Sequence, residues 1–417
     1  MTFNIQLYFL VNLFILFFIS INKVSAQNEG IVPNRYIVVL KDSCADIAGI
    51  QTHVKELEAE IKQKTNQTVQ FDVRRMYTSA LMGYSAFLDD RALAIVKASP
   101  DVVFVEHDQY LTSNDLQTGG PWGLGRTNAR FKASSPYKFT FDPSWGAGVT
   151  VYILDTGINT NHIDFGGRAT TGMIAVSGEN ATDCIGHGTH VAGTVGSNTY
   201  GIARNASIVG VKVFMCNGTG RVSNTIAGLN WVLSDYTNRT KNSITKKTSK
   251  PKAIVNLSVS GPYSSALNAA IKNVVSAGIA VVSSAGNAAD NACKYSPASA
   301  PATICVGAIN VTEHVAPFSN YGKCVNIFAP GVSIRSTYIG SNNATALMSG
   351  TSMAAPHVSG VLAAIQSKSG PNPYPVQQLR SMLLSNATVG VLNITNASPN
   401  VMVYNPLILG IITQPYI

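Results

Sequence analysis

Charged side chains are scarce in this chain. They make up 12% of its 417 residues, against about 25% in an average soluble protein. Serine, threonine, asparagine and glycine supply the polarity instead, a balance more typical of secreted proteins than of cytosolic ones. The formal net charge is +9, but the basic residues are dispersed except for "TKKTSKPK" at Thr245–Lys252. We interpret that cluster as a solvated loop and expect no nucleic-acid partner.

Long apolar runs are missing after the N-terminus, so no membrane span is expected beyond it, because a span needs about 20 apolar residues. The N-terminal run "LYFLVNLFILFFISI" covers Leu7–Ile21, and small residues follow at Val24 and Ala26. This pattern predicts a signal peptide over residues 1–26. We therefore expect the protein to enter the secretory pathway and to be secreted or vacuolar.

N-x-S/T sequons are frequent, which fits that route and predicts a glycoprotein. They stand at Asn66, Asn180, Asn205, Asn217, Asn238, Asn256, Asn310, Asn343, Asn386, Asn393 and Asn396. Asn256 lies inside the apolar run "AIVNLSVSG", which predicts a buried strand. We expect that sequon to stay unmodified.

Low-complexity segments and internal repeats are also absent, but the texture of the chain changes across a polar linker, "TSNDLQTGG". Before the linker, "RYIVVLK" alternates like a strand and residues 53–64 read as a polar helix. "GYSAFLD" and "RALAIVKASPDVVFVEHDQYL" add strands and a second helix. We predict a small α+β domain over residues 27–114, with a sheet covered by two helices.

After the linker, short runs rich in valine and isoleucine alternate with helical patterns. The runs are "GVTVYILDTG", "ASIVGVKVF", "AIVNLSVSG" and "GIAVVSSAGN". Strands buried on both faces with helical crossovers are typical of a parallel sheet. We predict an α/β fold over residues 115–417, a doubly wound and mostly parallel sheet flanked by helices. Ligands bind such sheets at the carboxyl ends of the strands.

Two histidines stand three residues apart in "DCIGHGTHVAG". A zinc protease would need H-E-x-x-H, but Gly188 and Thr189 separate His187 from His190. Both could be core histidines at a helix start. We favour His187 as a catalytic base and His190 as structural support that packs or hydrogen-bonds within the same helix.

Three further residues provide the parts of a nucleophilic site. Asp155 closes an apolar strand, where a carboxylate is costly unless it is paired. Ser352 lies in "SGTSMAAPHVSGVLAAIQS", and Pro356 is tolerated only in a first helical turn, so Ser352 is expected at a helix N-terminus. Asn287 ends "SSAGN" and can donate to an oxyanion. Each residue alone equally fits a cap or a turn, but together they supply a nucleophile, a base, an orienting carboxylate and an oxyanion donor.

The boxes "ILDTGI", "GHGTHVAGTV", "SSAGN" and "SGTSMAAPHVSG" resemble, in this order, those of subtilisin-type serine proteases. "PWGLGR", "SNYGKCVNIFAPG" and "STYIG" are similar to the proteinase K-like branch, especially fungal cerevisin-type enzymes. "RYIVVLK", "GYSAFL" and "PDVVFVEHD" resemble the inhibitory propeptide of the family. The resemblance implies a serine endopeptidase made as a zymogen that cuts itself near Asn114. The alternative is a catalytically silent binding protein or decoy, which would require the loss of a triad residue.

The resemblance also implies roles for individual residues. Ser352 attacks the peptide carbonyl, His187 is the base, Asp155 orients it, and Asn287 binds the oxyanion. Two edges of the chain bind substrate: Gly218, Thr219 and Gly220 on one side, and Ser258, Val259 and Ser260 on the other. Ser260 replaces a glycine that is usual in the wall of the P1 pocket, so we expect an apolar P1 preference in a narrowed pocket.

Disulfides, cofactors and partners follow from the same resemblance. It implies the pairs Cys184–Cys216 and Cys293–Cys324, which an oxidising compartment favours, while Cys305 is expected to be a buried, inert thiol. The calcium site of the branch has an aspartate where this chain has Asn326, a poorer ligand. The carbonyls of Pro301 and Thr303 leave weak calcium binding at most, so we predict no metal and no cofactor. The expected partners are protein or peptide substrates and the chain's own propeptide, and the expected state is a monomer.

Overall fold

The computed structural model describes residues 31–44, 46–65, 69–112, 122–132, 137–394 and 397–409. The predicted signal peptide and the predicted cleavage site near Asn114 lie outside these ranges. Within them, no helix is long and apolar enough to cross a membrane.

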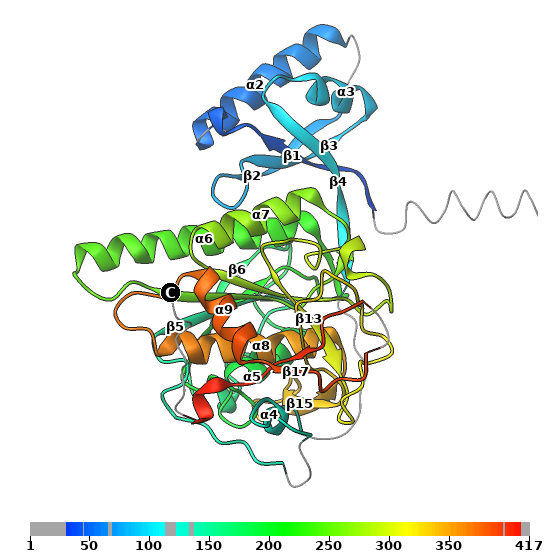
Figure 1. The fold of residues 1–417 in the computed structure, drawn as a ribbon. Coiled ribbons are helices and arrows are strands. Elements are labelled where there is room, and N and C mark those ends of the chain that lie inside the picture. The colour runs from blue at the N-terminus through cyan, green and yellow to red at the C-terminus, as the bar shows by residue number, and fades with distance from the viewer. Residues whose placement is uncertain are drawn as a thin grey trace, which may run out of the picture.

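The N-terminal domain is an antiparallel sheet with two helices on one face (Figure 1). Its strands lie in the order β2–β3–β1–β4. They cover Ile31–Leu40 (β1), Phe71–Tyr77 (β2), Gly83–Leu88 (β3) and Val102–Thr112 (β4), and the helices cover Ile47–Lys64 (α2) and Asp90–Ala98 (α3). The predicted α+β domain is confirmed. Its first helix begins before the predicted residue 53, because Asp46 caps it by accepting a hydrogen bond from Gly49 N at 2.8 Å.

The C-terminal domain contains a nine-stranded sheet in the order β17–β18–β14–β13–β11–β9–β5–β7–β6. All neighbouring pairs are parallel except β17 with β18. The strands cover Val149–Asp155 (β5), Ala169–Ile174 (β6), Ser207–Lys212 (β7), Lys252–Leu257 (β9), Ala280–Ser284 (β11), Ile304–Ile309 (β13), Ile327–Pro330 (β14), Thr388–Val389 (β17) and Val401–Met402 (β18). The predicted doubly wound, mostly parallel sheet is confirmed. The strand order reverses at β5, which makes its carboxyl end the expected ligand site.

Helices cover both faces of this sheet. On one face α5 (His187–Gly196) packs against α8 (Thr351–Ser367) over one hydrophobic core. On the other face α6 (Val222–Thr245) and α7 (Ser265–Ser276) lie side by side over a second core. Ile37 and Val39 of β1 belong to that second core, so the N-terminal sheet sits directly on α6 and α7 (Figure 1).

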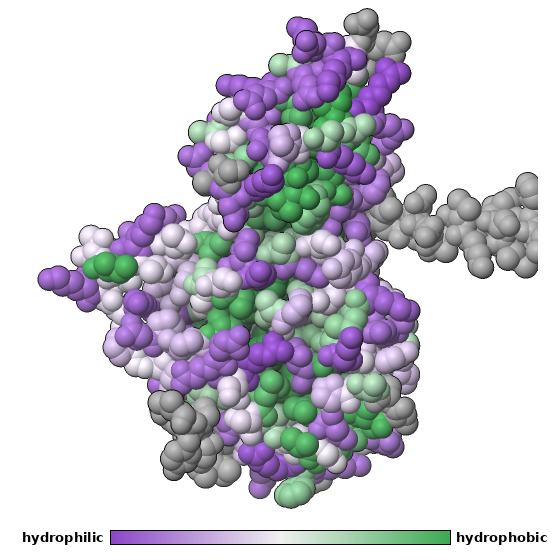
Figure 2. Space-filling view, turned by 45° about the horizontal axis from the view of Figure 1, so that its top comes forward, coloured by the Kyte–Doolittle hydropathy of each residue, from purple (hydrophilic) through white to green (hydrophobic). Residues whose placement is uncertain are grey.

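The basic cluster at Thr245–Lys252 begins at the end of α6. Residues 245–250 are exposed, as predicted, and the projecting end of the molecule in Figure 2 is largely hydrophilic. Lys252 is the exception to the predicted solvated loop. It starts β9, is 8% exposed, and donates from Nζ to the carbonyl of Ser369 at 2.7 Å.

Candidate active site

Asp155 is the last residue of β5 and is fully buried. Its Oδ1 accepts a hydrogen bond from Thr156 N at 2.7 Å and lies 2.6 Å from His187 Nδ1. The cost of burying the carboxylate is therefore offset by two partners. The structure brings Asp155 and His187 together, so Asp155 is more than a residue of a surface turn.

His187 is the first residue of α5, and glycines on both sides let it approach β5. Gly186 has a φ of 92°, and a Cβ there would lie 2.3 Å from the ring of Tyr338. A Cβ on Gly188 would lie 2.1 Å from the carbonyl oxygen of Gly157. Because only glycine fits both positions, the start of α5 lies against the turn that follows Asp155.

Ser352 is the second residue of α8, as its predicted helix-terminal position requires. It is 3% exposed, and its Oγ donates to the carbonyl of Ser258 at 3.3 Å. Since α5 and α8 pack against each other, His187 and Ser352 lie in the first turns of two neighbouring helices. Backbone N–H groups at a helix N-terminus favour a developing negative charge.

The prediction that Pro356 lies in the first turn is wrong. The helix begins at Thr351, so Pro356 lies in the second turn, where its missing N–H would otherwise bind the carbonyl of Ser352. Ser258 Oγ donates to that carbonyl instead, at 2.8 Å. Ser258, predicted only as part of a substrate edge, thus supports the helix that carries Ser352.

Asn287 is held in one orientation by the residue before Ser352. Its Oδ1 accepts hydrogen bonds from Thr351 N at 2.9 Å and from Thr351 Oγ1 at 2.8 Å. The amide nitrogen therefore faces away from Thr351. The amide nitrogen is thus not engaged by Thr351, and the role of Asn287 as an oxyanion donor stays a prediction.

The first predicted substrate edge is the short strand β8 (Thr219–Arg221). Gly218 before it has a φ of 80°, and a Cβ on Gly220 would lie 2.8 Å from the ring of Phe214. The strand pairs antiparallel with the end of β4, in which residues 110–112 face residues 221–219. The end of the N-terminal domain thus occupies the edge that sequence analysis assigned to substrate.

The second predicted edge follows β9. Val259 is buried, and Ser260 is half-buried. A Cβ on Gly286 would lie 2.8 Å from Ser260 Oγ, so Ser260 lies against the turn that carries Asn287. The Ser260 hydroxymethyl group therefore lies close to Gly286, the residue before Asn287.

His190 has a structural position. It is fully buried, and burial lowers its pKa to about 3, so the ring is neutral. Its Nε2 lies 2.9 Å from the carbonyl oxygen of Ile334. The expected hydrogen bond within the same helix is wrong, because Ile334 belongs to a strand, β15 (Ile334–Thr337).

The structure forms both expected disulfides, Cys184–Cys216 with a Cα–Cα distance of 5.4 Å and Cys293–Cys324 with 5.3 Å. The first tethers the segment before His187 to the segment before β8. Cys305 is buried, and burial raises its pKa to about 12, as expected for an inert thiol.

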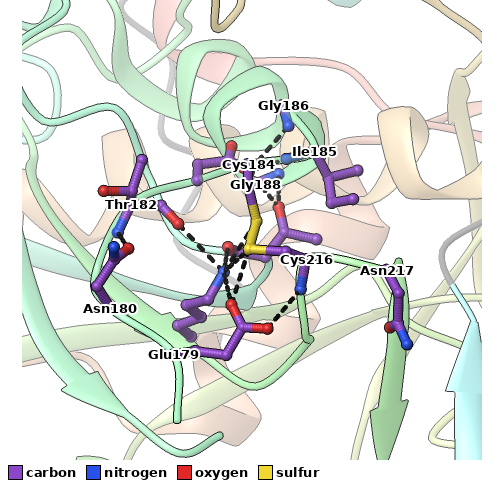
Figure 3. Close-up of a disulfide and its surroundings, with 12 residues drawn as sticks. Glu179, Asn180, Thr182, Cys184, Ile185, Gly186, Gly188, Cys216 and Asn217 are labelled. Atoms are coloured by element: carbon purple, nitrogen blue, oxygen red, sulfur yellow. Dashed lines mark hydrogen bonds and ion pairs between the residues drawn. A yellow bond between two sulfur atoms is a disulfide. The ribbon is translucent and has the colours of Figure 1, made fainter.

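Lys212 was not predicted from the sequence as part of the site. Its Nζ lies 3.6 Å from Cys184 Sγ and 3.9 Å from Cys216 Sγ. Figure 3 shows this disulfide beside Glu179. The residue is 1% exposed, and its Nζ donates to the carbonyls of Thr156 at 2.7 Å and Thr182 at 3.1 Å. Glu179 Oε2 lies 3.6 Å away and balances the charge. The signal in the sequence is a single lysine inside the apolar run "ASIVGVKVF".

Two of the residues implied for calcium already have hydrogen-bond donors in the structure. Asn326 Oδ1 already accepts a hydrogen bond from Cys305 N at 2.9 Å. The carbonyl of Thr303 accepts one from Arg380 at 2.8 Å. Each of these two oxygens thus has a donor within the chain, and Arg380 brings a positive charge to the carbonyl of Thr303. The absence of a metal stays a prediction.

Comparison with known proteins defines the class. Residues 146–401 match the Subtilase family of peptidases, and residues 35–113 match the peptidase inhibitor I9 family. An extracellular serine proteinase of Thermus sp. is 40% identical over 90% of both chains. Alkaline protease 1 of Aspergillus clavatus is 39% identical over 91% of this chain and 92% of its own. Cerevisin of Saccharomyces cerevisiae is 36% identical over 90% of this chain and 64% of its own.

Solved structures agree with the sequence comparisons. The crystal structure of a cold-adapted subtilisin-like serine proteinase superposes with a TM-score of 0.61 at 37% identity, covering 68% of this chain and 97% of that one. The chain belongs to the subtilase family of serine proteases and carries an I9 inhibitor domain at its N-terminal side.

Proposed function

We propose that this protein is a secreted serine endopeptidase that is made as a self-processing zymogen. One observation supports it most directly. Asp155 Oδ1 and His187 Nδ1 lie 2.6 Å apart in a buried pair at the switch point of the sheet, beside the helix that begins at Thr351. The relatives named as extracellular and alkaline proteases support the reaction and the destination.

In the proposed reaction, Ser352 Oγ attacks the peptide carbonyl and His187 accepts its proton. Asp155 holds the ring through Nδ1 and stabilises the imidazolium that forms. The tetrahedral oxyanion binds to the Asn287 amide and the backbone N–H of Ser352. When the intermediate collapses, His187 donates the proton to the leaving amine. Water then hydrolyses the acyl-enzyme ester by the same route.

The N-terminal domain is proposed to keep the enzyme latent until it is released. Its strand β4 pairs with β8 and so blocks one side of the substrate site. Two carboxylates of the same strand, the buried Asp108 and the half-buried Glu106, hold it on the helices below. Asp108 accepts hydrogen bonds from Ser223 N at 2.9 Å and from Ser223 Oγ, and Glu106 accepts one from Ser264 Oγ. Ser223 and Ser264 lie at the N-termini of α6 and α7, where a negative charge is favoured.

Specificity, processing and modification complete the proposal. The position of Ser260 against Gly286 supports a narrowed P1 pocket with an apolar preference. Signal removal after Ala26, glycosylation at exposed sequons, a monomeric state and the absence of a metal cofactor remain parts of the proposal. The proposal that Asn256 stays unmodified is supported by its fully buried side chain, whose Nδ2 donates to Ser258 Oγ.

The proposal is tested by substituting the nucleophile in the full-length chain. Purified Ser352→Ala should stay unprocessed and hydrolyse no peptide, whereas wild type should yield a new N-terminus near Asn114. Ser367→Ala, at the far end of the same helix, is the matched control and should process normally. Efficient maturation of purified Ser352→Ala, or a secreted wild-type protein that begins at Gln27, would contradict self-processing.

A further inference from the structure

The carboxylate of Asp183 is heavily engaged close to the candidate triad. It is 2% exposed and accepts five hydrogen bonds. The donors are Thr156 Oγ1 at 2.8 Å, Ile185 N at 3.1 Å, Gly186 N at 2.8 Å, Thr189 N at 2.9 Å and Thr189 Oγ1 at 2.6 Å. Four of these donors belong to the segment that begins α5, and one belongs to the turn after β5.

The hydrogen bond from Thr156 connects Asp183 to the end of β5, the strand that carries Asp155. An ionised carboxylate only accepts hydrogen bonds, so the single hydroxyl proton of Thr156 must point toward Asp183. The oxygen of that hydroxyl is then free to accept, and it binds Gly188 N at 2.9 Å. Two successive residues of the strand end thus contact two successive residues of α5: Asp155 with His187, and Thr156 with Gly188.

We propose that Asp183 and Thr156 form a positioning pair that fixes the register between Asp155 and His187. The inference rests on the proposed serine protease function and deepens it. The pair touches no reacting atom; it acts by holding α5 and the end of β5 at the separation at which the imidazole meets its carboxylate. The Thr156–Gly188 hydrogen bond links the end of β5 to the start of α5 one residue beyond the Asp155–His187 bond. The Asp155–His187 bond therefore does not have to fix the separation of the two segments alone.

A purely structural helix cap would explain the contacts of Asp183 to Gly186 and Thr189, but it would not require Thr156. The hydroxyl of Thr156 therefore separates the two roles. Thr156→Val removes the hydroxyl and keeps the branched shape, and Thr156→Ser keeps the hydroxyl. Asp183→Asn places amide hydrogens among five donors. Asp164→Asn is the matched control, because Asp164 binds Thr199 N and Oγ1 in the same manner outside the site.

The experiment measures kcat, KM and the pH profile of kcat/KM on a peptide substrate. Each enzyme is expressed as the full-length chain, allowed to process, and normalised by fluorophosphonate titration of its active sites. We expect Thr156→Val and Asp183→Asn each to lower kcat about 10- to 100-fold with KM nearly unchanged, which is the effect of one lost hydrogen bond to a charged group. The acid limb of the profile should move to lower pH, because a loosened Asp155 stabilises the imidazolium less. Thr156→Ser and Asp164→Asn should match wild type.

A combined variant tests whether the two residues act as one unit. Thr156→Val with Asp183→Asn should lower kcat about as much as one substitution alone. Unchanged kcat per active site in Thr156→Val, with only a lower melting temperature, would overturn the positioning role. Equal losses in Thr156→Ser and Thr156→Val would overturn it as well. A wild-type enzyme that neither titrates nor hydrolyses peptide would instead contradict the proposed function. If Asp183→Asn fails to fold, the comparison of the two Thr156 variants still decides.

Discussion

The hydrogen bond between Ser258 and the carbonyl of Ser352 predicts that substitutions at Ser258 and at Pro356 have coupled effects on the free energy of unfolding. Ser258 Oγ donates to Ser352 O at 2.8 Å because Pro356 has no N–H to do so, and it accepts from Asn256 Nδ2 at 2.9 Å. All three polar groups are buried. Ser258→Ala therefore leaves a carbonyl and an amide group without these partners, which should cost about 2–4 kcal/mol of the free energy of unfolding.

A second substitution should restore part of the lost free energy of unfolding. Pro356→Ala supplies a backbone N–H four residues after Ser352, so the helix itself can satisfy the carbonyl. In the Pro356→Ala background, Ser258→Ala should cost about 1–2 kcal/mol less than in the presence of the proline. Pro356→Ala alone should change stability little, because the carbonyl of Ser352 already has a donor.

The assay is denaturant unfolding of the four proteins that form this cycle, each carrying Ser352→Ala to prevent autolysis. This substitution leaves the backbone carbonyl in place. The account predicts a favourable coupling of at least ~1 kcal/mol between the two sites. Equal costs of Ser258→Ala in the two backgrounds would refute the claim that Ser258 replaces the donor missing at Pro356.

Three further predictions concern the ionisable side chains Asp108, His190 and Arg380. Asp108→Ala should weaken the binding of the N-terminal domain to the C-terminal domain roughly 100-fold, because Ser223 loses its buried acceptor. Peptidase activity should then appear earlier after processing. Asp90→Ala, at an exposed position, is the control and should leave the onset of activity unchanged. His190, with a pKa lowered to about 3 by burial, stays neutral in the fold while the unfolded chain takes up a proton below pH ~6.5. The contribution of His190 to stability should therefore fall by about 2 kcal/mol from pH 7 to pH 5. Denaturant unfolding should show a drop smaller by that amount in His190→Asn than in wild type, and drops of the same size in both proteins would contradict this assignment. Arg380→Met should lower the melting temperature, and added calcium should not restore it. Chelation of calcium should leave the melting temperature of the wild-type protein unchanged.

Features that repeat locally were predictable from the sequence. Continuous valine and isoleucine runs predicted the parallel strands, because burial on both faces removes polar alternation. The four catalytic boxes predicted that Asp155 and His187 meet, and Ser352 lies at the helix start that glycine and the downstream periodicity indicated.

Long-range polar contacts were not predictable, since no local pattern encodes them. Ser258 and Ser352 are 94 positions apart, and the role of Ser258 depends on where α8 begins. The partner of His190 lies 144 positions away. Asp183 lies 27 positions from Thr156, and only the fold brings the two side chains together.

The central claim is that Ser352 is a nucleophile activated by His187. The most direct measurement is labelling of the processed protein with a fluorophosphonate, followed by mass spectrometry of its peptides. The account predicts a single labelled residue, Ser352, and loss of that label in His187→Ala. Absence of label on Ser352 in processed protein, or equal labelling in His187→Ala, would contradict it.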